Sequence, residues 1–323
     1  MSKAQTPTRL VSFVMPVLNE AQHLASAVES VFEQELPKGM GAELVLALGP
    51  STDSTNQIAN DLKAKYPTLT LVDNPKGLTS AGLNGAIAAT SGSIVVRVDA
   101  HSKLTPGYVL TAVEILDSNS QIGNVGGQML AQGETEFESA VAWAYRSRYG
   151  LGGGKFHVGG DPGAVDTVYL GVFRKEALVK AGFFDETVVR GQDWELNQRI
   201  RAQGYLIWFD PRLKVVYRPR SSWTSLLSQF YKTGLWRGKL SRETFPNISF
   251  RYLAPPALVL LTLLWVPAWV YLLIVAAIAI TAKDLKTDSK YWLLVVLPTM
   301  HYSWGIGFIL GILFPSLAKA GDE

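Results

Sequence analysis

Short apolar runs alternate with amphipathic segments from Leu10 to about Gly127. The apolar runs predict buried strands, and they are LVSFVMPV, ELVLAL, TLTLV, SIVVRV and IGNVGG. Between them, AQHLASAVESVF, SAGLNGAIAAT and PGYVLTAVEILD place apolar residues three and four positions apart, as amphipathic helices do. Strands that alternate with helices predict βαβ units, a largely parallel sheet and an α/β fold. Because ligands of such sheets bind beyond the carboxyl ends of the strands, the candidate binding loops are PVLNE, GPSTDST and VDAHS.

The pattern changes after residue 150. GLGGGKFHVGGDPGAV contains seven glycines between residues 150 and 163 and no hydrophobic periodicity, which predicts a mobile loop over a site. Further on, DTVYLGVF predicts a strand, EALVKAGFF a short helix, and WELNQRIRAQG a helix that ends at Gly204.

The segment SSWTSLLSQFYKTGLWRGK predicts an amphipathic helix. Trp223, Leu226, Leu227 and Phe230 share one face of this helix, and Lys and Arg residues follow them. Such a composition is typical of a helix in the membrane interface. A helix that faces a protein core is the alternative.

Two apolar blocks near the C-terminus predict membrane attachment. Leu253–Thr281 and Tyr291–Ala318 contain no Asp, Glu, Lys or Arg. Each block is long enough to cross a hydrocarbon layer of about 30 Å. As one helix the first block would be ~43 Å long, more than one untilted span and less than two. A break at Pro267 would turn it into a short hairpin, so we expect two or three hydrophobic segments, at about 253–281 and 291–318.

Small and polar residues within the second block predict further features. Gly307 and Gly311 have the four-residue spacing that lets helices pack closely. His301 marks either a functional position or an imidazole that is simply satisfied at the membrane interface.

The positive charge of the chain is concentrated beside the first apolar block. The 323 residues are 48% hydrophobic and 18% charged, with a formal net charge of +3. Residues 212–251 contain nine Lys or Arg and one acid, Glu243. This basic collar is expected to attract anionic lipid headgroups or a phosphorylated lipid. Alternatively, it only sets the orientation of the chain in the membrane. Its position beside an apolar block does not indicate nucleic-acid binding. We therefore predict a domain 1–220, an interfacial helix with the basic collar at 221–250, and a membrane domain 251–323.

The N-terminal segment MSKAQTPTRLVSFVMPV predicts a first strand. It has too short an apolar stretch and no small-residue cleavage site for a secretory signal. We thus expect a multi-pass protein of the cytoplasmic membrane whose soluble domain lies in the cytosol. The chain has no cysteine, which excludes disulfides, thiolate metal sites and a cysteine nucleophile.

The hexapeptide RVDAHS places a carboxylate and an imidazole at the end of a predicted buried strand. Asp99 and His101 offer one oxygen and one nitrogen to a divalent cation whose other positions face a diphosphate. The imidazole favours Mn²⁺ over Mg²⁺. Alternatively, Asp99 caps the next turn and His101 is a surface residue.

A second pair of acids opens the helix in GQDWELNQRI. Asp193 and Glu195 are two residues apart, so they point to different faces of the helix and have different roles. One of them can face a pocket as a general base, while the other pairs with a neighbouring residue or interacts favourably with the N-terminal end of the helix dipole. The alternative is two ordinary acids at a helix N-terminus.

The order of these segments resembles a known family. VMPVLNE, STDST, NPKGLTSAGLNGAI, RVDAHS, GVFRKEALVKAGFFDE and GQDWELNQRIRAQGY are similar to the successive motifs of family 2 glycosyltransferases with the GT-A fold. The likeness covers about residues 8–240. VDAHS, VDTVYLGVFRKEAL, QDWELNQRI and the tail MHYSWGIGF are most similar to bacterial exopolysaccharide glucosyltransferases of the succinoglycan type, which act on lipid-linked acceptors.

The resemblance implies a role for each matching residue. It places Asp99 and His101 at the metal and sugar diphosphate, and Asp193 at the catalytic base. For the neighbours of Asp193, which are Gln192, Trp194 and Glu195, it implies contact with the acceptor or support of the residues that make that contact. Nucleotide or donor binding is implied for Pro16, Asn19, Glu20, Asp53, Lys76, Asn84 and Asp99.

Two departures from the family pattern change the expectation. Leu48 and Gly49 stand where many relatives have paired acids, one of which contacts the uracil ring. The Gln-X-X-Arg-Trp signature of processive synthases is missing, since Gln229 is followed by Lys232 and Thr233. We therefore expect addition of a single sugar, with a UDP-sugar as the donor implied by the resemblance alone.

The resulting expectation is an inverting, Mn²⁺- or Mg²⁺-dependent glycosyltransferase. It would move one hexose from a nucleotide sugar to a lipid-linked saccharide for cell-envelope or exopolysaccharide synthesis. Two alternatives stay open. One is a polyprenyl-phosphate glycosyltransferase, and the other is a catalytically silent membrane component that binds sugar nucleotides.

Overall fold

The computed structural model describes residues 9–244, 252–264 and 268–320. The chain forms two compact units. The first comprises residues 1–129 and 159–217, and the second comprises residues 130–158 and 218–323. Segment 130–158 lies within the predicted domain 1–220 but belongs to the second compact unit. The functional division at residue 220 stays a prediction.

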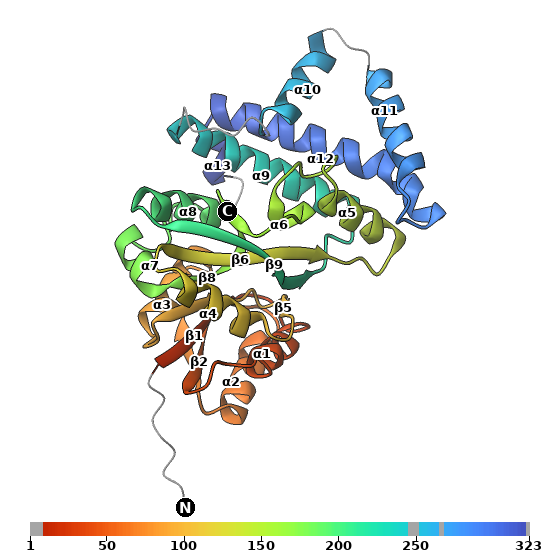
Figure 1. The fold of residues 1–323 in the computed structure, drawn as a ribbon. Coiled ribbons are helices and arrows are strands. Elements are labelled where there is room, and N and C mark those ends of the chain that lie inside the picture. The colour runs from red at the N-terminus through yellow and green to blue at the C-terminus, as the bar shows by residue number, and fades with distance from the viewer. Residues whose placement is uncertain (1–8, 245–251, 265–267, 321–323) are drawn as a thin grey trace, which may run out of the picture. The chain divides into compact units, whose positions relative to one another are not determined.

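The first unit contains one mixed sheet and the helices that cover it (Figure 1). Its strands are β1 (Arg9–Val17), β2 (Met40–Leu48), β3 (Leu69–Asp73), β4 (Ile94–Arg97), β5 (Lys103–Leu104), β6 (Ile122–Ala131), β7 (Gly163–Val165), β8 (Tyr169–Arg174) and β9 (Leu206–Tyr217). Its helices are α1 (Leu24–Phe32), α2 (Thr55–Lys65), α3 (Thr79–Ala88), α4 (Tyr108–Ser118), α7 (Lys175–Ala181) and α8 (Gln192–Ala202). The strands and helices that the hydrophobic pattern predicts are all present.

The sheet is parallel in one half and antiparallel in the other. Its order is β3-β2-β1-β4-β8-β6-β9-β5, with β7 paired to β9. β1 is parallel to both β2 and β4, and β2 is parallel to β3. β8 runs antiparallel to β4 and to β6. The predicted parallel arrangement is thus confirmed for β1 to β4. β8 is inserted antiparallel between β4 and β6, so β6 keeps the direction of β4 but is not its hydrogen-bonded neighbour. An apolar run predicts burial of a strand but not its place in the sheet.

The core of the first unit explains why these segments form layers. Val11, Phe13 and Met15 alternate along β1 and are buried in one cluster with the apolar faces of α1 and α4. Apolar residues recur every second position on the strand and every third or fourth position on the helices, so each element has one apolar face, and these faces pack together. Covering helices leave the carboxyl ends of β1, β2 and β4 as the positions from which loops can reach a ligand.

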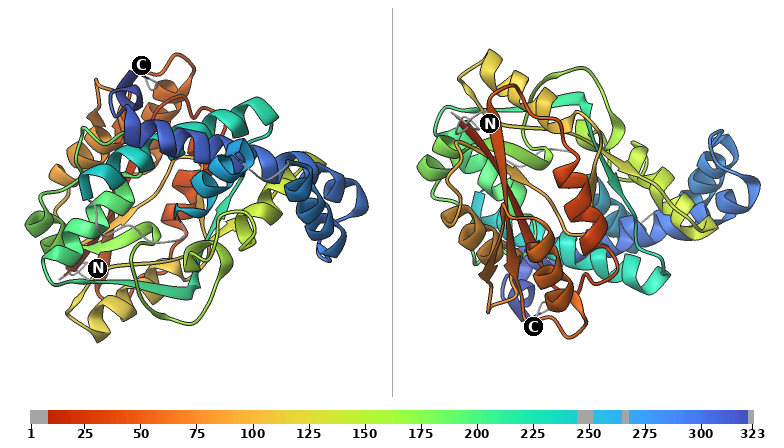
Figure 2. Two further views of the ribbon diagram at one scale, coloured as in Figure 1. Left: turned by 90° about the horizontal axis from the view of Figure 1, so that it is seen from above. Right: turned by 90° about the horizontal axis from the view of Figure 1, so that it is seen from below.

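The second unit is helical. Its helices are α5 (Glu136–Arg146), α6 (Lys155–Val158), α9 (Trp223–Thr244), α10 (Ala254–Leu264), α11 (Ala268–Thr281), α12 (Thr287–Leu313) and α13 (Leu317–Ala320). α9 and α12 lie side by side in each view (Figures 1 and 2). On α9, Leu226 and Phe230 are buried, whereas Trp223 and Leu227 are exposed. The core-facing alternative therefore describes part of this helix, and an interfacial position stays a prediction.

Glycines let the backbones of α9 and α12 approach closely. A Cβ atom built on Gly307 would lie 2.2 Å from the carbonyl oxygen of Tyr231, and one on Gly311 would lie 2.0 Å from that of Leu235. Gly234 on α9 approaches α12 in the same way. The close packing predicted from the glycine spacing is confirmed, and its partner is α9.

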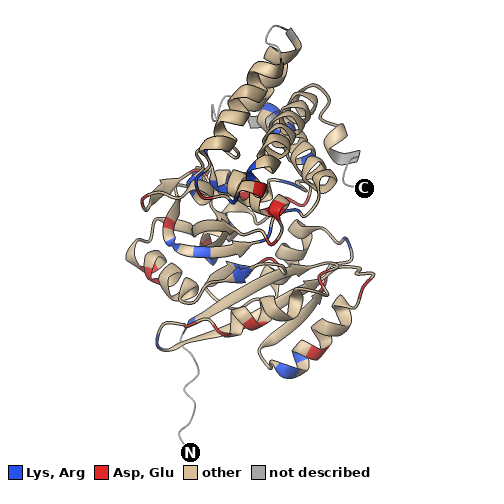
Figure 3. Ribbon diagram, turned by 90° about the vertical axis from the view of Figure 1, so that its right-hand side faces the viewer, with Lys and Arg blue, Asp and Glu red and all other residues tan. Residues whose placement is uncertain are grey.

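One described helix is long and apolar enough to cross a membrane, and it is α12. At 1.5 Å per residue α12 is ~40 Å long, whereas α10 and α11 are ~16 and ~21 Å long and fall short of a ~30 Å layer. Neither α10 nor α11 carries a charged residue, and both ribbons are tan in Figure 3. The first apolar block thus forms two short helices in place of a full span, and Pro267 between them lies outside the described residues. Several membrane spans stay a prediction.

The basic collar is partly neutralised within each unit. Arg212 pairs with the buried Asp210 at 2.9 Å. In the second unit, Arg218 pairs with the buried Glu138 at 3.0 Å and with Glu134 at 2.9 Å. Arg251 lies outside the described residues. Fewer of these charges are therefore available to a lipid surface than the sequence count indicates.

Candidate functional site

The loops after β1, β2 and β4 meet at the carboxyl edge of the parallel half-sheet. In strand order β2-β1-β4, β1 is the central neighbour, so its loop can contact both others. The backbone N–H of Thr52 donates to Asn19 Oδ1 at 2.8 Å, and the N–H of Ala21 donates to Asp53 Oδ2 at 3.2 Å. On the other side, His101 Nδ1 lies 2.7 Å from Glu20 Oε1. The three candidate loops therefore form one continuous site.

Asn19 and Asp53 hold the loop geometry. Asn19 has a φ of 55°, a left-handed conformation that asparagine tolerates better than most residues. Asp53 accepts hydrogen bonds from the N–H groups of Thr55 and Ala21. The pKa of Asp53 is lowered, most of all by a hydrogen bond with the Thr55 side chain and further by these two N–H groups. Pro16 lies within β1, one residue before the strand ends. The donor-binding roles implied for these residues stay predictions, and the contacts of Asn19 and Asp53 also serve the fold.

Arg97 links the two halves of the site. This residue ends β4, its side chain is only 5% exposed, and its Nη1 donates to Asp193 Oδ1 of α8. Its Nη2 and Nε donate to Asp99 Oδ1 at 3.0 and 3.3 Å. One guanidinium therefore bridges the proposed base and the proposed metal ligand, which are 94 positions apart in the sequence.

Burial sets the protonation behaviour of Asp193. Loss of hydration raises its pKa to about 6, because it outweighs the lowering by Arg97, and the negative charge of Asp99 adds to the rise. The side chain nevertheless keeps 26% of its surface accessible, so a substrate hydroxyl can reach it. A carboxylate with a pKa near neutrality and an accessible oxygen has the properties of a general base.

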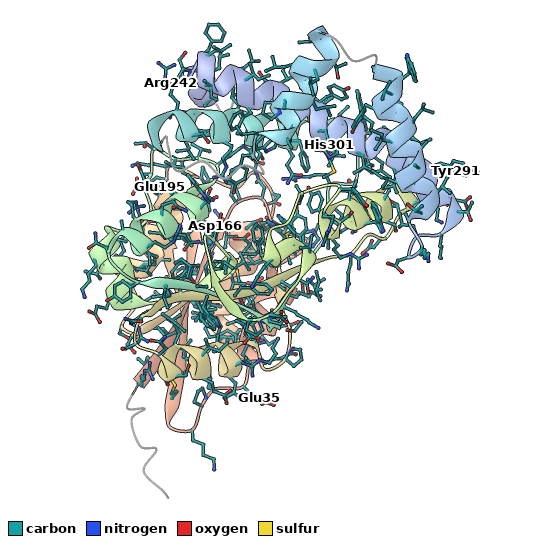
Figure 4. The ribbon with its side chains drawn as sticks, turned by 45° about the horizontal axis from the view of Figure 1, so that its top comes forward. Glu35, Asp166, Glu195, Arg242, Tyr291 and His301 are labelled. Atoms are coloured by element: carbon teal, nitrogen blue, oxygen red, sulfur yellow. The ribbon has the colours of Figure 1, made fainter. Side chains whose placement is uncertain are left out.

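The other residues at the start of α8 have different surroundings. Glu195 forms a bidentate pair with Arg199, with both N–O distances 2.6 Å, and Figure 4 labels it on α8. Arg199 in turn donates to the carbonyl oxygen of Phe183 at 2.6 Å. Trp194 is buried, and Gln192 is half-buried at the first turn. The two acids thus have different partners, as their spacing predicts, and Glu195 supports the loop before α8.

The donor atoms and charges around Asp99 fit a divalent cation. Among the described residues, no group of three or more His, Cys, Asp and Glu side chains forms a complete metal site. Asp99 and His101 provide one oxygen and one nitrogen, which suits a cation that takes its other ligands from phosphates and water. The cluster of Arg97, Asp99 and Asp193 has a formal charge of −1 when both acids are ionised, and this charge attracts a further cation.

Lys76 and Asn84 contact a different part of the first unit. Lys76 Nζ lies 2.6 Å from Glu186 Oε2. Asn84 exchanges two hydrogen bonds with the backbone of Phe184, at 2.8 and 3.0 Å. These contacts hold the segment before α8 against α3. The donor-binding role implied for both residues stays a prediction.

Arg97 and Tyr169 are site residues that the sequence analysis did not assign. A lone arginine inside the apolar run SIVVRV was the available signal, because a buried guanidinium requires carboxylate partners. Tyr169 begins β8, and its hydroxyl lies 3.4 Å from Ser102 Oγ. Burial, together with the charge of Asp99, holds the pKa of Tyr169 well above its ordinary value. No sequence signal places Tyr169 beside RVDAHS, because that proximity depends on the pairing of β8 with β4.

The His301 imidazole in the second unit is hydrogen-bonded at both nitrogens. Figure 4 labels His301 on α12. Its Nδ1 lies 2.7 Å from Tyr271 Oη, and its Nε2 lies 2.8 Å from the carbonyl oxygen of Tyr149. Since a carbonyl only accepts, Nε2 carries the proton and Nδ1 accepts from the tyrosine. The imidazole is thus satisfied by structural partners.

Comparison with known proteins identifies similar sequences over most of the chain. Residues 12–180 match the family model "Glycosyl transferase family 2". The chain is 31% identical to the succinoglycan biosynthesis protein ExoA of Rhizobium meliloti over 77% of its own length and 76% of that protein. It is 22% identical, over 94% of its length and 97% of the other, to the dolichyl N-acetyl-alpha-D-glucosaminyl phosphate 3-beta-D-2,3-diacetamido-2,3-dideoxy-beta-D-glucuronosyltransferase of Methanococcus voltae.

A solved structure supports the same fold. The mannosyltransferase PcManGT of Pyrobaculum calidifontis, determined in complex with GDP-Man and Mn²⁺, superposes with a TM-score of 0.64. The match covers 96% of this chain and 89% of that one, at 19% sequence identity. At this identity the likeness concerns the fold alone.

Proposed function

Because the chain belongs to glycosyl transferase family 2, we propose that it transfers one hexose from a nucleotide sugar to a lipid-linked saccharide, with inversion at the anomeric carbon. The observation that carries this proposal is the Asp193–Arg97–Asp99 cluster at the carboxyl edge of the sheet. It combines an accessible carboxylate of raised pKa with a candidate diphosphate site. The lipid-linked acceptor is supported by the dolichyl-linked substrate in the name of the Methanococcus voltae relative and by the exposed apolar surface of α10 to α12.

The proposed reaction is a displacement at the anomeric carbon. Asp193 accepts the proton of the acceptor hydroxyl while that oxygen forms its bond to the carbon. The bond from this carbon to the phosphate oxygen breaks on the opposite face, and the nucleoside diphosphate leaves with the electron pair. Attack from the face opposite to the leaving group inverts the configuration, so an α-linked nucleotide sugar gives a β-glycoside.

In this proposal, Asp99 and His101 would hold Mn²⁺ or Mg²⁺. When bound there, the cation would supply positive charge for the negative charge that develops on the departing diphosphate. Glu20 orients the His101 ring through Nδ1, as carboxylates commonly do for metal-binding histidines. Arg97 fixes Asp193 relative to Asp99, so that base and leaving group keep a constant separation.

The chain has no carboxylate at the position where many relatives contact the nucleobase of the donor. Leu48 ends β2 and Gly49 follows it, so neither offers a carboxylate to a uracil ring. A UDP-hexose is the donor that the family resemblance favours. The Pyrobaculum calidifontis structure contains GDP-Man, so guanosine donors belong in the same test.

Transfer to lipid tests the proposed function. Membranes containing the full chain are incubated with Mn²⁺, a bacterial lipid extract and tritiated UDP-, GDP- or dTDP-hexoses, and label is counted in the organic phase. We expect one donor to label a lipid, and chelation of the metal to stop it. Nucleotide-sugar binding without transfer from any donor would instead identify a silent binding component.

A further inference from the structure

The second unit contains a cavity that the proposed reaction does not use. It has a volume of about 450 Å³ and is lined by the loop from Arg148 to Gly154, by α6, and by residues of α9, α10 and α12. All of its lining residues belong to this unit. The volume falls within the range of ordinary small-ligand pockets. Residues 150–157 of the glycine-rich segment, which was predicted as a loop over a site, form one wall of this cavity and include most of α6.

The polar side of the cavity is cationic. Arg148 and Arg237 line it together with two histidines, and none of its described lining residues is acidic. Arg148 is exposed, and no hydrogen bond or ion pair joins it to the rest of the described chain. The guanidinium of Arg237 lies 4.6 Å from the ring centre of Tyr252. Two arginines without a lining acid favour an anion, above all phosphate oxygens.

The remaining walls are apolar. Phe230, Leu258, Met300 and Trp304 are among the lining residues. Trp304 stacks on Phe308 and on Tyr252, with ring centres 5.1 and 6.2 Å apart, which gives this wall a fixed aromatic surface. A ligand that fills this space presents an anionic group at one end and a hydrocarbon chain at the other.

The outer faces of the helices extend this apolar environment. Leu263 on α10 and Ile280 on α11 are 75% and 77% exposed, and α10 also lines the cavity. A chain too long for about 450 Å³ can continue along such helices within lipid. The cavity therefore suits the phosphate end of a single long chain better than a free phosphate, which would leave the aromatic wall unused.

We propose that this cavity binds the phosphorylated end of an isoprenoid lipid acceptor, with Arg148 and Arg237 on the phosphate and Trp304 against the first isoprene units. This inference rests on the proposed function, because it assumes that the acceptor is lipid-linked. It adds the place in the fold that holds the lipid phosphate and the residues that contact it.

Binding of short isoprenoid probes tests the proposal. Purified full chain in detergent is titrated calorimetrically with farnesyl diphosphate and farnesyl phosphate. Arg148→Gln and Arg237→Gln are each expected to weaken binding at least tenfold. Arg146→Gln is the matched control, since Arg146 is an exposed arginine two positions from Arg148 that does not line the cavity, and it should change affinity less than twofold.

Three results would overturn the proposal. Farnesol that binds as tightly as farnesyl phosphate would show that no anion is recognised. Inorganic phosphate or phosphatidylglycerol that displaces the probe at equal concentration would show a site for free phosphate or for membrane headgroups. Equal affinities of wild type, Arg148→Gln and Arg146→Gln would show that Arg148 does not contact the ligand. Arg148→Gln removes no internal contact, so misfolding does not confuse this comparison.

The two proposals fail in different ways. If the wild-type chain binds farnesyl phosphate but transfers no sugar from any donor, the proposed function fails and the cavity assignment stands. If sugar transfer proceeds with an unchanged acceptor KM in Arg148→Gln and Arg237→Gln, the cavity assignment fails alone. Nucleotide-sugar binding, measured in the same variants, should stay within twofold of wild type because it belongs to the first unit.

Discussion

Arg97 donates a hydrogen bond to Asp193, and the same guanidinium holds Asp99. Arg97 ends β4, Asp99 lies in the loop directly after it, and Asp193 lies in the first turn of α8, so the complete cluster forms only when α8 packs beside the end of β4. The same cluster therefore contributes both to the proposed reaction and to the stability of the first unit.

Replacing the proposed base should remove most of the turnover. Asp193→Asn keeps the size of the side chain but cannot accept a proton, so kcat for transfer to a saccharide acceptor should fall 10²–10⁴-fold. Asp61→Asn on the surface of α2 is the matched control and should be neutral. An undiminished rate in Asp193→Asn would favour a polyprenyl-phosphate acceptor, whose anionic oxygen needs no base.

The pH dependence should follow the ionisation of Asp193. Only the carboxylate form accepts a proton, and the pKa of about 6 means that half of the free enzyme is active at pH 6. We expect kcat/KM to be level from pH 7 to 8 and to fall about tenfold per pH unit well below 6. The profile should lose this acidic limb in Asp193→Asn. A wild-type rate that stays constant down to pH 5 would contradict the assignment.

Removing the bridging arginine should cost more stability than removing a surface arginine. Arg97→Met leaves Asp99 and Asp193 uncompensated, and loss of one partner of a buried pair costs about 3–5 kcal/mol. Arg9→Met breaks an exposed pair with Asp117 and should cost less than about 1 kcal/mol. Thermal midpoints of the detergent-purified variants give the comparison. Equal midpoints would mean that the Arg97 cluster does not support the fold.

The Glu20–His101 contact should affect metal affinity directly. Glu20→Gln weakens the orientation of the His101 ring, and loss of such support typically lowers metal affinity 10–100-fold. The measurement is free Mn²⁺ by electron paramagnetic resonance with nucleoside diphosphate present, which does not depend on turnover. Glu29→Gln, on the surface of α1, should bind Mn²⁺ like wild type. If the Glu20 and Glu29 variants bind Mn²⁺ equally well, His101 is not oriented through Glu20.

Close packing of α9 and α12 should make Gly307 intolerant of a side chain. The Cβ atom of Gly307→Ala would meet the carbonyl oxygen of Tyr231, so the helices must separate, at a cost of roughly 1–3 kcal/mol. Gly85 on α3 has open space around it, and Gly85→Ala should stabilise the chain by about 0.5–1 kcal/mol. Opposite shifts of the two thermal midpoints are expected. A neutral Gly307→Ala would show that the two helices can adjust.

The hydrophobic pattern was sufficient to predict the parallel half of the sheet and its binding loops. Alternating strands and amphipathic helices have a strongly preferred arrangement, so the edge at which PVLNE, GPSTDST and VDAHS meet follows from the pattern. The antiparallel half was not predictable in the same way. DTVYLGVF is a buried run, and burial predicts neither its direction nor its insertion between β4 and β6.

Long-range contacts account for the rest of what the sequence did not reveal. The bond of Arg97 to Asp193 joins residues 96 positions apart, and the proximity of Tyr169 to Ser102 depends on strand pairing. The cavity is formed by a glycine-rich loop and three helices that follow it at a distance in the sequence. Local patterns predict the elements but not which side chains of distant elements meet.

Release of nucleoside diphosphate from the accepted donor tests the central claim most directly. The rate is measured in membranes with Mn²⁺ and with a chelator, for wild type and for Asp99→Ala. We predict that release is rapid only for wild type with Mn²⁺, and that chelation and Asp99→Ala each abolish it. A full rate in Asp99→Ala, or in wild type after chelation, would contradict a metal-assisted transfer centred on Asp99.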